Sequence, residues 1–365
     1  MNHIQCSLAV ALTVACGLQP VEAQTTQKFT AAKHNEYGLV YSLPVTHVRI
    51  MVEAEKTVSK AGLFYKYAKK YLGIDNVVAA DSVAWKLKSI DMATYGVPNP
   101  DNRYLMQFKP GSAPFLMLTE NGLPLAINEE NVAALIPKKE PRKAEPGRLD
   151  NYGYAKSLPG ELLAGESTAK RAELAARMIY RIRESRTNFA TGEADQMPPD
   201  GAALKLVLDN LDEQEKDLMA LFCGTRTTET AVAEFDYVPS GEVSKEVIFR
   251  LSDAAGIVDK TDLSGAPVTL ALNILERGAL PKDEKGEEKK LPKGAVMYRI
   301  PGRAAISLSY EGAEVCRKEF DVAQFGVDFG LDPAMFVDKK RPSFVKFYSE
   351  TGSIKELGVK DLEAQ

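Results

Sequence analysis

The sequence has few of the residues that build metal sites. Its 365 residues include three histidines and four cysteines, and beyond residue 23 only His34, His47, Cys223 and Cys316 remain. A zinc or other transition-metal site needs several such ligands at defined spacing, whereas these four lie far apart in the chain. We therefore expect no metal and no cofactor. Cys223 and Cys316 are expected to be buried free thiols, because one falls at a helix C-terminus and the other in a strand.

Motifs that bind phosphate or activate a serine are also missing. The chain contains no Gly-x-Gly-x-x-Gly, no Walker pattern and no Gly-x-Ser-x-Gly elbow. His47 falls on the polar face of an expected strand and His34 in a polar lead-in, without the nearby partners that a general base needs. We assign no catalytic residue. With 46 basic and 50 acidic residues and a net charge of −4, the sequence also gives no reason to expect nucleic-acid binding.

The first 23 residues differ in composition from the rest. Cys6 to Leu18 is an uncharged, mostly apolar run that is too short to span a bilayer as a helix. It is followed by a small-x-small site that ends at Ala23, so we predict a secretory signal peptide, residues 1–23, although Met1–Gln5 lacks the usual basic residue. The mature chain has no expected transmembrane segment. We expect an exported protein of the periplasm or cell surface.

A lipid anchor at Cys16 is the alternative for this segment. The residues before Cys16 are Thr13-Val14-Ala15. They differ from the Leu-led motif that usually precedes an acylated cysteine. We therefore favour a protein without a lipid anchor.

A helical hairpin is predicted for residues 161–224. Apolar residues recur at helical spacing in two stretches: Ala172, Ala175, Ala176, Ile179 and Ile182, then Leu204, Val207, Leu208, Leu211, Leu218 and Phe222. Asp200 and Gly224 are typical start and stop residues for the second helix. If the helices run antiparallel through a loop at 187–197, Glu215 comes level with Arg171.

Charged residues interrupt both apolar stripes of this hairpin. We expect a structural ion pair between Arg171 and Glu215, and Arg183 is a further candidate because it lies on the apolar side of the first helix. A functional carboxylate at Glu215 is the alternative. The structural reading is favoured because half-buried charges are usually paired.

Strand patterns occupy the chain on both sides of the hairpin. Residues 46–55 alternate apolar and polar side chains, as a half-buried strand does, and residues 231–237 and 247–251 do the same. Asn121-Gly122 predicts a type I′ β-hairpin, and 98–102 reads as a loop. We predict an α+β fold with two antiparallel, sandwich-like lobes, residues 24–160 and 225–365. The first lobe has a short helix at about 62–73 and an exposed linker at 136–150.

An aromatic stripe is the one feature that suggests binding. Phe64, Tyr65, Tyr67 and Tyr71 fall in the short helix, where flat rings can stack on a sugar or anchor a partner protein. The structural alternative is that the stripe packs the helix onto a sheet, since aromatic side chains bury much apolar area.

Several segments resemble a family of secreted bacterial proteins known as domain of unknown function 4831, found mainly in Bacteroidetes-type bacteria. The resemblance lies in Gly38–Pro44, Arg49–Glu55, Phe64–Ile74, Met117–Asn128, Ala176–Gly201 and Gln324–Gly326. It implies an exported protein with a shared architecture, and it implies no activity and no catalytic residue.

The sequence favours a non-catalytic cell-envelope module that binds another envelope protein or a glycan. The alternative is a glycan-directed hydrolase or lyase that uses paired carboxylates in a cleft between the lobes, because carboxylates are plentiful in the chain.

Overall fold

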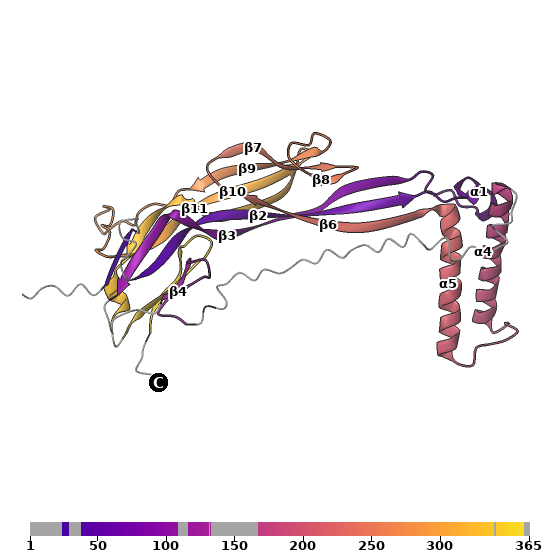
Figure 1. Cartoon of the computed structure of the whole chain (residues 1–365), viewed down its shortest axis with the longest axis horizontal. Helices are drawn as coiled ribbons and strands as arrows, with labels where there is room; N and C mark the ends of the chain where they lie inside the picture. Colours follow the sequence, from indigo (N-terminus) through magenta and orange to yellow (C-terminus); the bar gives the residue numbers. More distant parts are fainter. Residues whose placement is uncertain are drawn as a thin grey trace, which may run out of the picture.

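The protein is elongated, with a β-rich body at one end and a helical hairpin at the other (Figure 1). The computed structural model describes residues 24–28, 38–108, 116–130, 132, 167–338 and 341–360. The predicted signal peptide, Cys16, His34 and the linker 136–150 lie outside the described residues. Three antiparallel sheets and a set of helices make up the fold, so the predicted α+β class is confirmed.

The first sheet runs along the length of the molecule. Its strands lie in the order β1-β3-β2-β6. Their bounds are β1 Gln24–Lys28, β2 Leu39–Lys60, β3 Ser82–Phe108 and β6 Thr225–Tyr237. With 22 residues, β2 spans about 70 Å. Val48, Ile50, Val52 and Ala54 are completely buried, as their alternation in the sequence predicts.

The loop predicted at residues 98–102 is instead part of β3. Ser42 pairs with Arg103 and Pro44 with Pro98, so four residues of β3 lie opposite Leu43 alone. An enlarged β-bulge of this kind bends a strand without ending it. The Pro and Asn residues that suggested a loop form this bulge.

The second sheet packs face to face on the first. Its order is β11-β10-β9-β7-β8. The strands are β7 Val243–Ser252, β8 Gly256–Val258, β9 Ala266–Glu276, β10 Val296–Tyr310 and β11 Ala313–Leu331. Side chains of both sheets form the largest core, to which Ile50, Phe249, Leu270 and Ile306 belong. This pair of sheets forms a sandwich, and its strands come from both sides of the hairpin.

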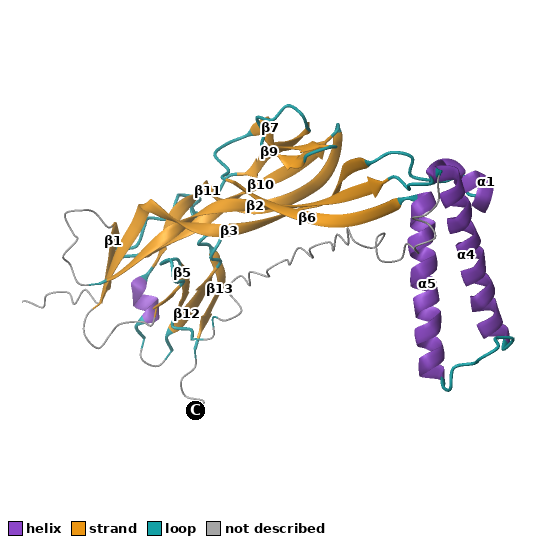
Figure 2. Ribbon diagram, turned by 45° about the vertical axis from the view of Figure 1, so that its right-hand side comes forward, coloured by secondary structure: helices purple, strands orange, loops and turns teal. Residues whose placement is uncertain are grey.

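The third sheet joins residues from both ends of the chain. Its order is β13-β12-β5-β4 (Figure 2). The strands are β4 Leu116–Leu118, β5 Pro124–Ile127, β12 Ser343–Phe347 and β13 Ile354–Val359, and the 3-10 helix η4 Pro333–Phe336 packs beside them. Since β6 pairs with β2 and β12 with β5, segments before and after the hairpin share two of the three sheets.

The β4–β5 hairpin forms where Asn121-Gly122 predicts it, but its turn type differs. Gly122 has φ +84°, whereas Asn121 has no positive φ. The Gly122 amide donates to the Thr119 carbonyl, and Leu118 pairs with Pro124. The loop therefore consists of residues 120–122, a type I turn with Gly122 in the left-handed position, and the type I′ prediction is wrong.

The helices gather at the far end of the first sheet. They are the 3-10 helix η2 Tyr65–Tyr67, α1 Ala68–Leu72, α4 Thr168–Thr191 and α5 Gly201–Cys223. Ser167 and Asp200 cap the two long helices by accepting from backbone amides three residues on. Among the described residues, no helix has the length and apolar character that crossing a bilayer requires.

Candidate functional site

A three-stranded arm carries the helical hairpin away from the body. The arm consists of the outer ends of β2, β3 and β6, with register from Glu55 opposite Lys86 to Lys60 opposite Thr225. Trp85 marks its start, because its ring lies against Gly256 of β8 and its amide donates to the Asp253 carbonyl in the turn between β7 and β8. Beyond this point, no second sheet lies behind the arm in the part of the chain that the structure describes (Figure 1).

The hairpin is attached to the arm through short, hydrogen-bonded connections. Helix α5 passes into β6 through Gly224 alone, whose added Cβ would lie 2.4 Å from the Lys60 carbonyl oxygen. The Phe64 amide donates to Leu221 and the Val78 amide to Cys223, at 2.7 and 2.8 Å. These contacts fix the direction in which the hairpin points.

The aromatic stripe packs against the base of the hairpin and not on a sheet. Phe64 is 2% exposed and its ring lies 5.5 Å from that of Phe222. Tyr67 and Tyr71 stack on each other at 6.1 Å and pack against the same core, while Tyr65 is half-buried. The buried ring of Phe64 therefore has no surface to offer a ligand. Tyr65, Tyr67 and Tyr71 are half-buried, so a binding role for these three residues stays a prediction.

The two long helices meet along a seam with alternating three- and four-residue spacing. The seam residues of α4 are Ala172, Ala175, Ile179, Ile182, Arg186 and Phe189, and those of α5 are Leu204, Leu208, Leu211, Glu215, Leu218 and Phe222. This spacing is that of a coiled coil. Near the base, small alanines of α4 face larger side chains of α5 in the core. The five predicted apolar residues of α4 are all buried.

Glu215 forms the central polar contact of this seam. Its side chain is 13% exposed, and its carboxylate oxygens lie 2.6 Å from Arg183 Nε and 2.9 Å from Arg186 Nη1. Arg186 also contacts Asp212 at 2.6 Å. The expected partner Arg171 lies about three turns nearer the start of α4. The expected register assumed a loop at 187–197, whereas α4 continues to Thr191 and the loop lies at 192–200; α5 begins after Asp200, as expected.

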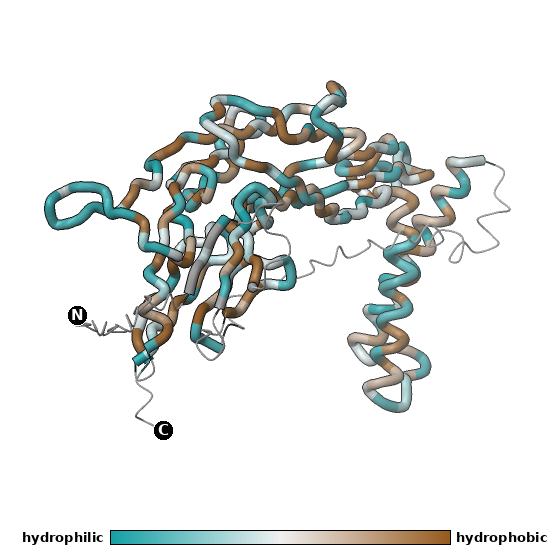
Figure 3. Tube along the Cα trace, turned by 60° about the vertical axis from the view of Figure 1, so that its left-hand side comes forward, coloured by the Kyte–Doolittle hydropathy of each residue, from teal (hydrophilic) through white to brown (hydrophobic). Residues whose placement is uncertain are grey.

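This register leaves the first turns of α5 beyond the end of α4. With Glu215 level with Arg183, the last residue of α4 lies level with about residue 207 of α5. Leu206 is 63% exposed, and Leu204, Val207 and Leu208 are only half-buried. Hydrophobic segments recur at this far end of the hairpin (Figure 3). An apolar stripe that the sequence predicts to be core is thus incompletely covered in its distal half.

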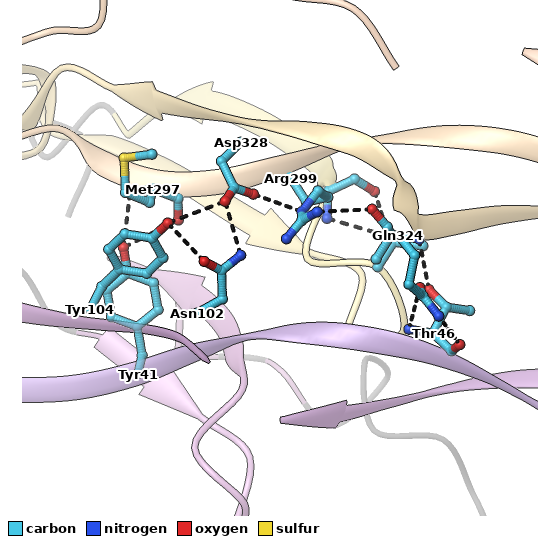
Figure 4. Close-up of polar contacts among 11 residues, drawn as sticks. Tyr41, Thr46, Asn102, Tyr104, Met297, Arg299, Gln324 and Asp328 are labelled. Carbon is cyan, nitrogen blue, oxygen red and sulfur yellow. Dashed lines mark hydrogen bonds and ion pairs between the residues drawn. The ribbon is translucent and has the colours of Figure 1, made fainter. Parts of the chain in front are cut away.

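A polar cluster lies at the junction of the sheets (Figure 4). Asp328 pairs with Arg299 at 2.7 Å and accepts from Asn102 and the Tyr104 hydroxyl at 2.9 and 3.2 Å. Tyr41 accepts from the Met297 amide at 2.8 Å. Burial raises the pKa of Tyr41 and of Tyr104, so both stay neutral donors.

The same junction includes a second group of contacts. The Gln324 side chain bonds both the amide and the carbonyl of Thr46, and the Thr46 hydroxyl bridges the Ala323 amide and the Glu350 carbonyl. Thr46 lies on β2, Gln324 on β11 and Glu350 next to β12, so these bonds join three sheets. The cluster links the three sheets through hydrogen bonds and the Arg299–Asp328 ion pair, and these contacts hold the sheets in register.

His47 belongs to a separate cluster on the outer face of the first sheet. Its Nδ1 lies 2.7 Å from Asp236, whose other oxygen accepts from the Tyr95 hydroxyl at 2.8 Å. The Arg49 guanidinium stacks 4.9 Å from the Tyr95 ring. These are cross-strand pairs between β2, β3 and β6, which stabilise a sheet.

The remaining chemical candidates also have structural surroundings. Cys223 and Cys316 are free, as expected, but they are half-buried and not fully buried. Their burial raises the pKa of each thiol, which makes them weak nucleophiles. Among the residues that the structure describes, no three His, Cys, Asp or Glu side chains gather as a metal site.

Comparison with known proteins identifies one relationship. Residues 37–355 match the family described as "Domain of unknown function (DUF4831)". No curated protein and no solved structure matches the chain. The match covers the body, the arm and the hairpin, so the three parts belong to one family architecture.

Proposed function

Since the chain belongs to the DUF4831 family, whose description assigns no activity, we propose from its geometry that it is a non-catalytic binding or assembly module of the cell envelope. The hairpin is its partner-binding element. The observation that carries this proposal is the hydrogen-bonded attachment of the hairpin to the end of a narrow arm. A helix pair held away from the body in a fixed direction presents its faces to another molecule.

The surface chemistry of the hairpin supports binding to a protein. Leu206 and Met197 are exposed apolar residues at its far end, and half-buried leucines lie beside them. Apolar side chains with a charged surround are typical of protein contacts. The predicted signal peptide supports an envelope location for this contact.

Site-specific photo-crosslinking in intact cells tests the proposal. A photoreactive amino acid replaces Leu206 on the hairpin or, as the matched control, Leu263 between β8 and β9, which is 80% exposed. Both chains keep residues 1–23 and carry a C-terminal tag. We expect a discrete crosslinked product from position 206 and none from 263. Equal products from both positions, or none from 206, would overturn the proposal.

A further inference from the structure

We propose that the partner bound by the hairpin is a second copy of this chain, and that the two hairpins form a four-helix bundle with their tips at the same end. This inference rests on the proposed function, since it names the partner of the same surface.

The two helices of the hairpin have opposite charge. Helix α4 carries six basic and two acidic residues, whereas α5 carries two basic and five acidic residues. Contact between two α4 helices or two α5 helices brings like charges together, which is destabilising. Contact between α4 of one copy and α5 of the other brings opposite charges together.

Symmetry then determines the arrangement of the two copies. A two-fold axis perpendicular to the helices stacks α4 on α4 and α5 on α5 of the other hairpin. A two-fold axis parallel to the helices places each α4 against the α5 of the other copy, and every helix then lies between two antiparallel neighbours of opposite charge. Closed two-fold dimers are the commonest soluble assemblies. The charges therefore favour the arrangement with both tips at one end.

The two sides of the hairpin differ in a way that selects the contact face. On one side of the seam lie the ion pairs of Arg183 and Arg186. On the other side, the positions flanking the seam are the half-buried Met178 and Ser185 of α4 and Val207 of α5. Together with the incompletely covered Leu204 and Leu211, these residues form what we call the flank face. It lacks the fixed ion pairs of the opposite side and offers apolar area to a second hairpin.

The size of this face agrees with a stable dimer. A 23-residue helix is about 35 Å long and about 10 Å wide, so two helices side by side present about 700 Å². The two copies together then bury about 1,400 Å², within the range of about 1,200–2,000 Å² for specific complexes. Because the body lies to one side of the hairpin (Figure 1), the two-fold axis places the second body on the opposite side.

Sedimentation equilibrium of the purified mature chain tests the inference. We expect a concentration-dependent dimer. Arg181 is exposed at the edge of the flank face, so Arg181→Glu is expected to raise the dissociation constant at least tenfold. The matched control Lys205→Glu reverses an exposed charge on the ion-pair side and is expected to leave dimerisation intact. A monomeric wild type, or equal effects of the two variants, would overturn the inference.

The orientation of the hairpins is tested by a distance between spin labels. One label is placed at Gln196, in the exposed loop at the tip, in a chain whose Cys223 and Cys316 are replaced by alanine. Tips at the same end give a label separation below about 30 Å, whereas tips at opposite ends are separated by about the hairpin length, 40 Å or more. The longer distance would refute the proposed bundle.

The cell experiment separates this inference from the proposed function. If the purified chain is monomeric and position 206 crosslinks to a different protein, the dimer is refuted and the binding role of the hairpin stands. If the purified chain dimerises and a photoreactive residue at Val207, on the flank face, gives a product of twice the chain mass, both are supported.

Discussion

Replacing Glu215 tests whether the middle of the hairpin is held by a charge or by shape. The Glu215→Gln variant keeps the shape of the side chain and removes its charge. The amide oxygen then accepts one ordinary hydrogen bond, which is weaker than a charge-assisted one by about 1 kcal/mol. The amide NH2 cannot accept from the second arginine, so that contact is lost and the variant should lose about 1–3 kcal/mol in all.

The Glu215→Leu variant is expected to behave differently. Leucine continues the apolar seam between Leu211 and Leu218, and its burial contributes about 2 kcal/mol. The two arginines are about 40% exposed and remain hydrated when their partner is lost. Replacement of a buried ionic group by an apolar side chain is often neutral, and we expect a change within about 1 kcal/mol.

Urea unfolding followed by circular dichroism at 222 nm measures these changes, because the two long helices dominate that signal. Fluorescence of Trp85, the single tryptophan, reports on the arm in the same samples. The control is Glu213→Gln, an exposed acid on the outer face of α5, with an expected change within about 0.5 kcal/mol. The reasoning is refuted if Glu215→Leu is less stable than Glu215→Gln, or if Glu215→Gln matches the control.

Three further predictions concern the body and the hairpin base. At Gly326 an added Cβ would lie 2.1 Å from the Ile300 carbonyl oxygen, so Gly326→Ala should lower the unfolding free energy by about 3 kcal/mol in urea titrations. In the control Gly241→Ala the added Cβ meets no atom within 4 Å, so the unfolding free energy should change little. Burial raises the pKa of Tyr41 and keeps its hydroxyl neutral in the folded state. The contribution of Tyr41 to the unfolding free energy is therefore complete below the pKa of an unfolded tyrosine, about 10, and should fall by about 1.4 kcal/mol per pH unit above it. Urea titrations from about pH 8 to 11 measure this fall, and an equally steep fall in the Tyr41→Phe variant would contradict the prediction. The raised pKa of Cys223 predicts alkylation by iodoacetamide at pH 8 at least about tenfold slower than in the urea-unfolded chain, measured by peptide mass mapping, and equal rates would show that the thiol is not protected.

Local patterns in the sequence predicted most individual elements correctly. The apolar spacing of α4, the caps at Asp200 and Gly224 and the alternation around Ile50 depend on neighbouring residues, and the structure has each of them. The bulge in β3 was missed because its Pro and Asn residues are equally compatible with a loop. Its recognition requires the opposite strand, which pairs at long range.

Contacts between distant segments account for the other differences. Pairing of β6 with β2 and of β12 with β5 joins the two halves of the chain, and no local pattern encodes it. Arg183, the further candidate, does pair with Glu215, whereas Arg171 was wrongly expected as its partner because the register of a helical hairpin depends on where the loop lies. The alternating spacing from Leu204 to Phe222 indicates that Glu215 belongs to the seam, but which turn of α4 it faces is shown only by its ion pair with Arg183.

The central claim is that the far end of the hairpin holds the partner. Its most direct test is copurification after chemical crosslinking in intact cells, with tagged wild type, Leu206→Glu and Leu263→Glu compared at equal abundance. Leu206 and Leu263 are both exposed, so neither change should disturb the fold. The account predicts that wild type and Leu263→Glu recover the same partner and that Leu206→Glu loses it. Recovery of that partner by Leu206→Glu at the wild-type level would contradict the account.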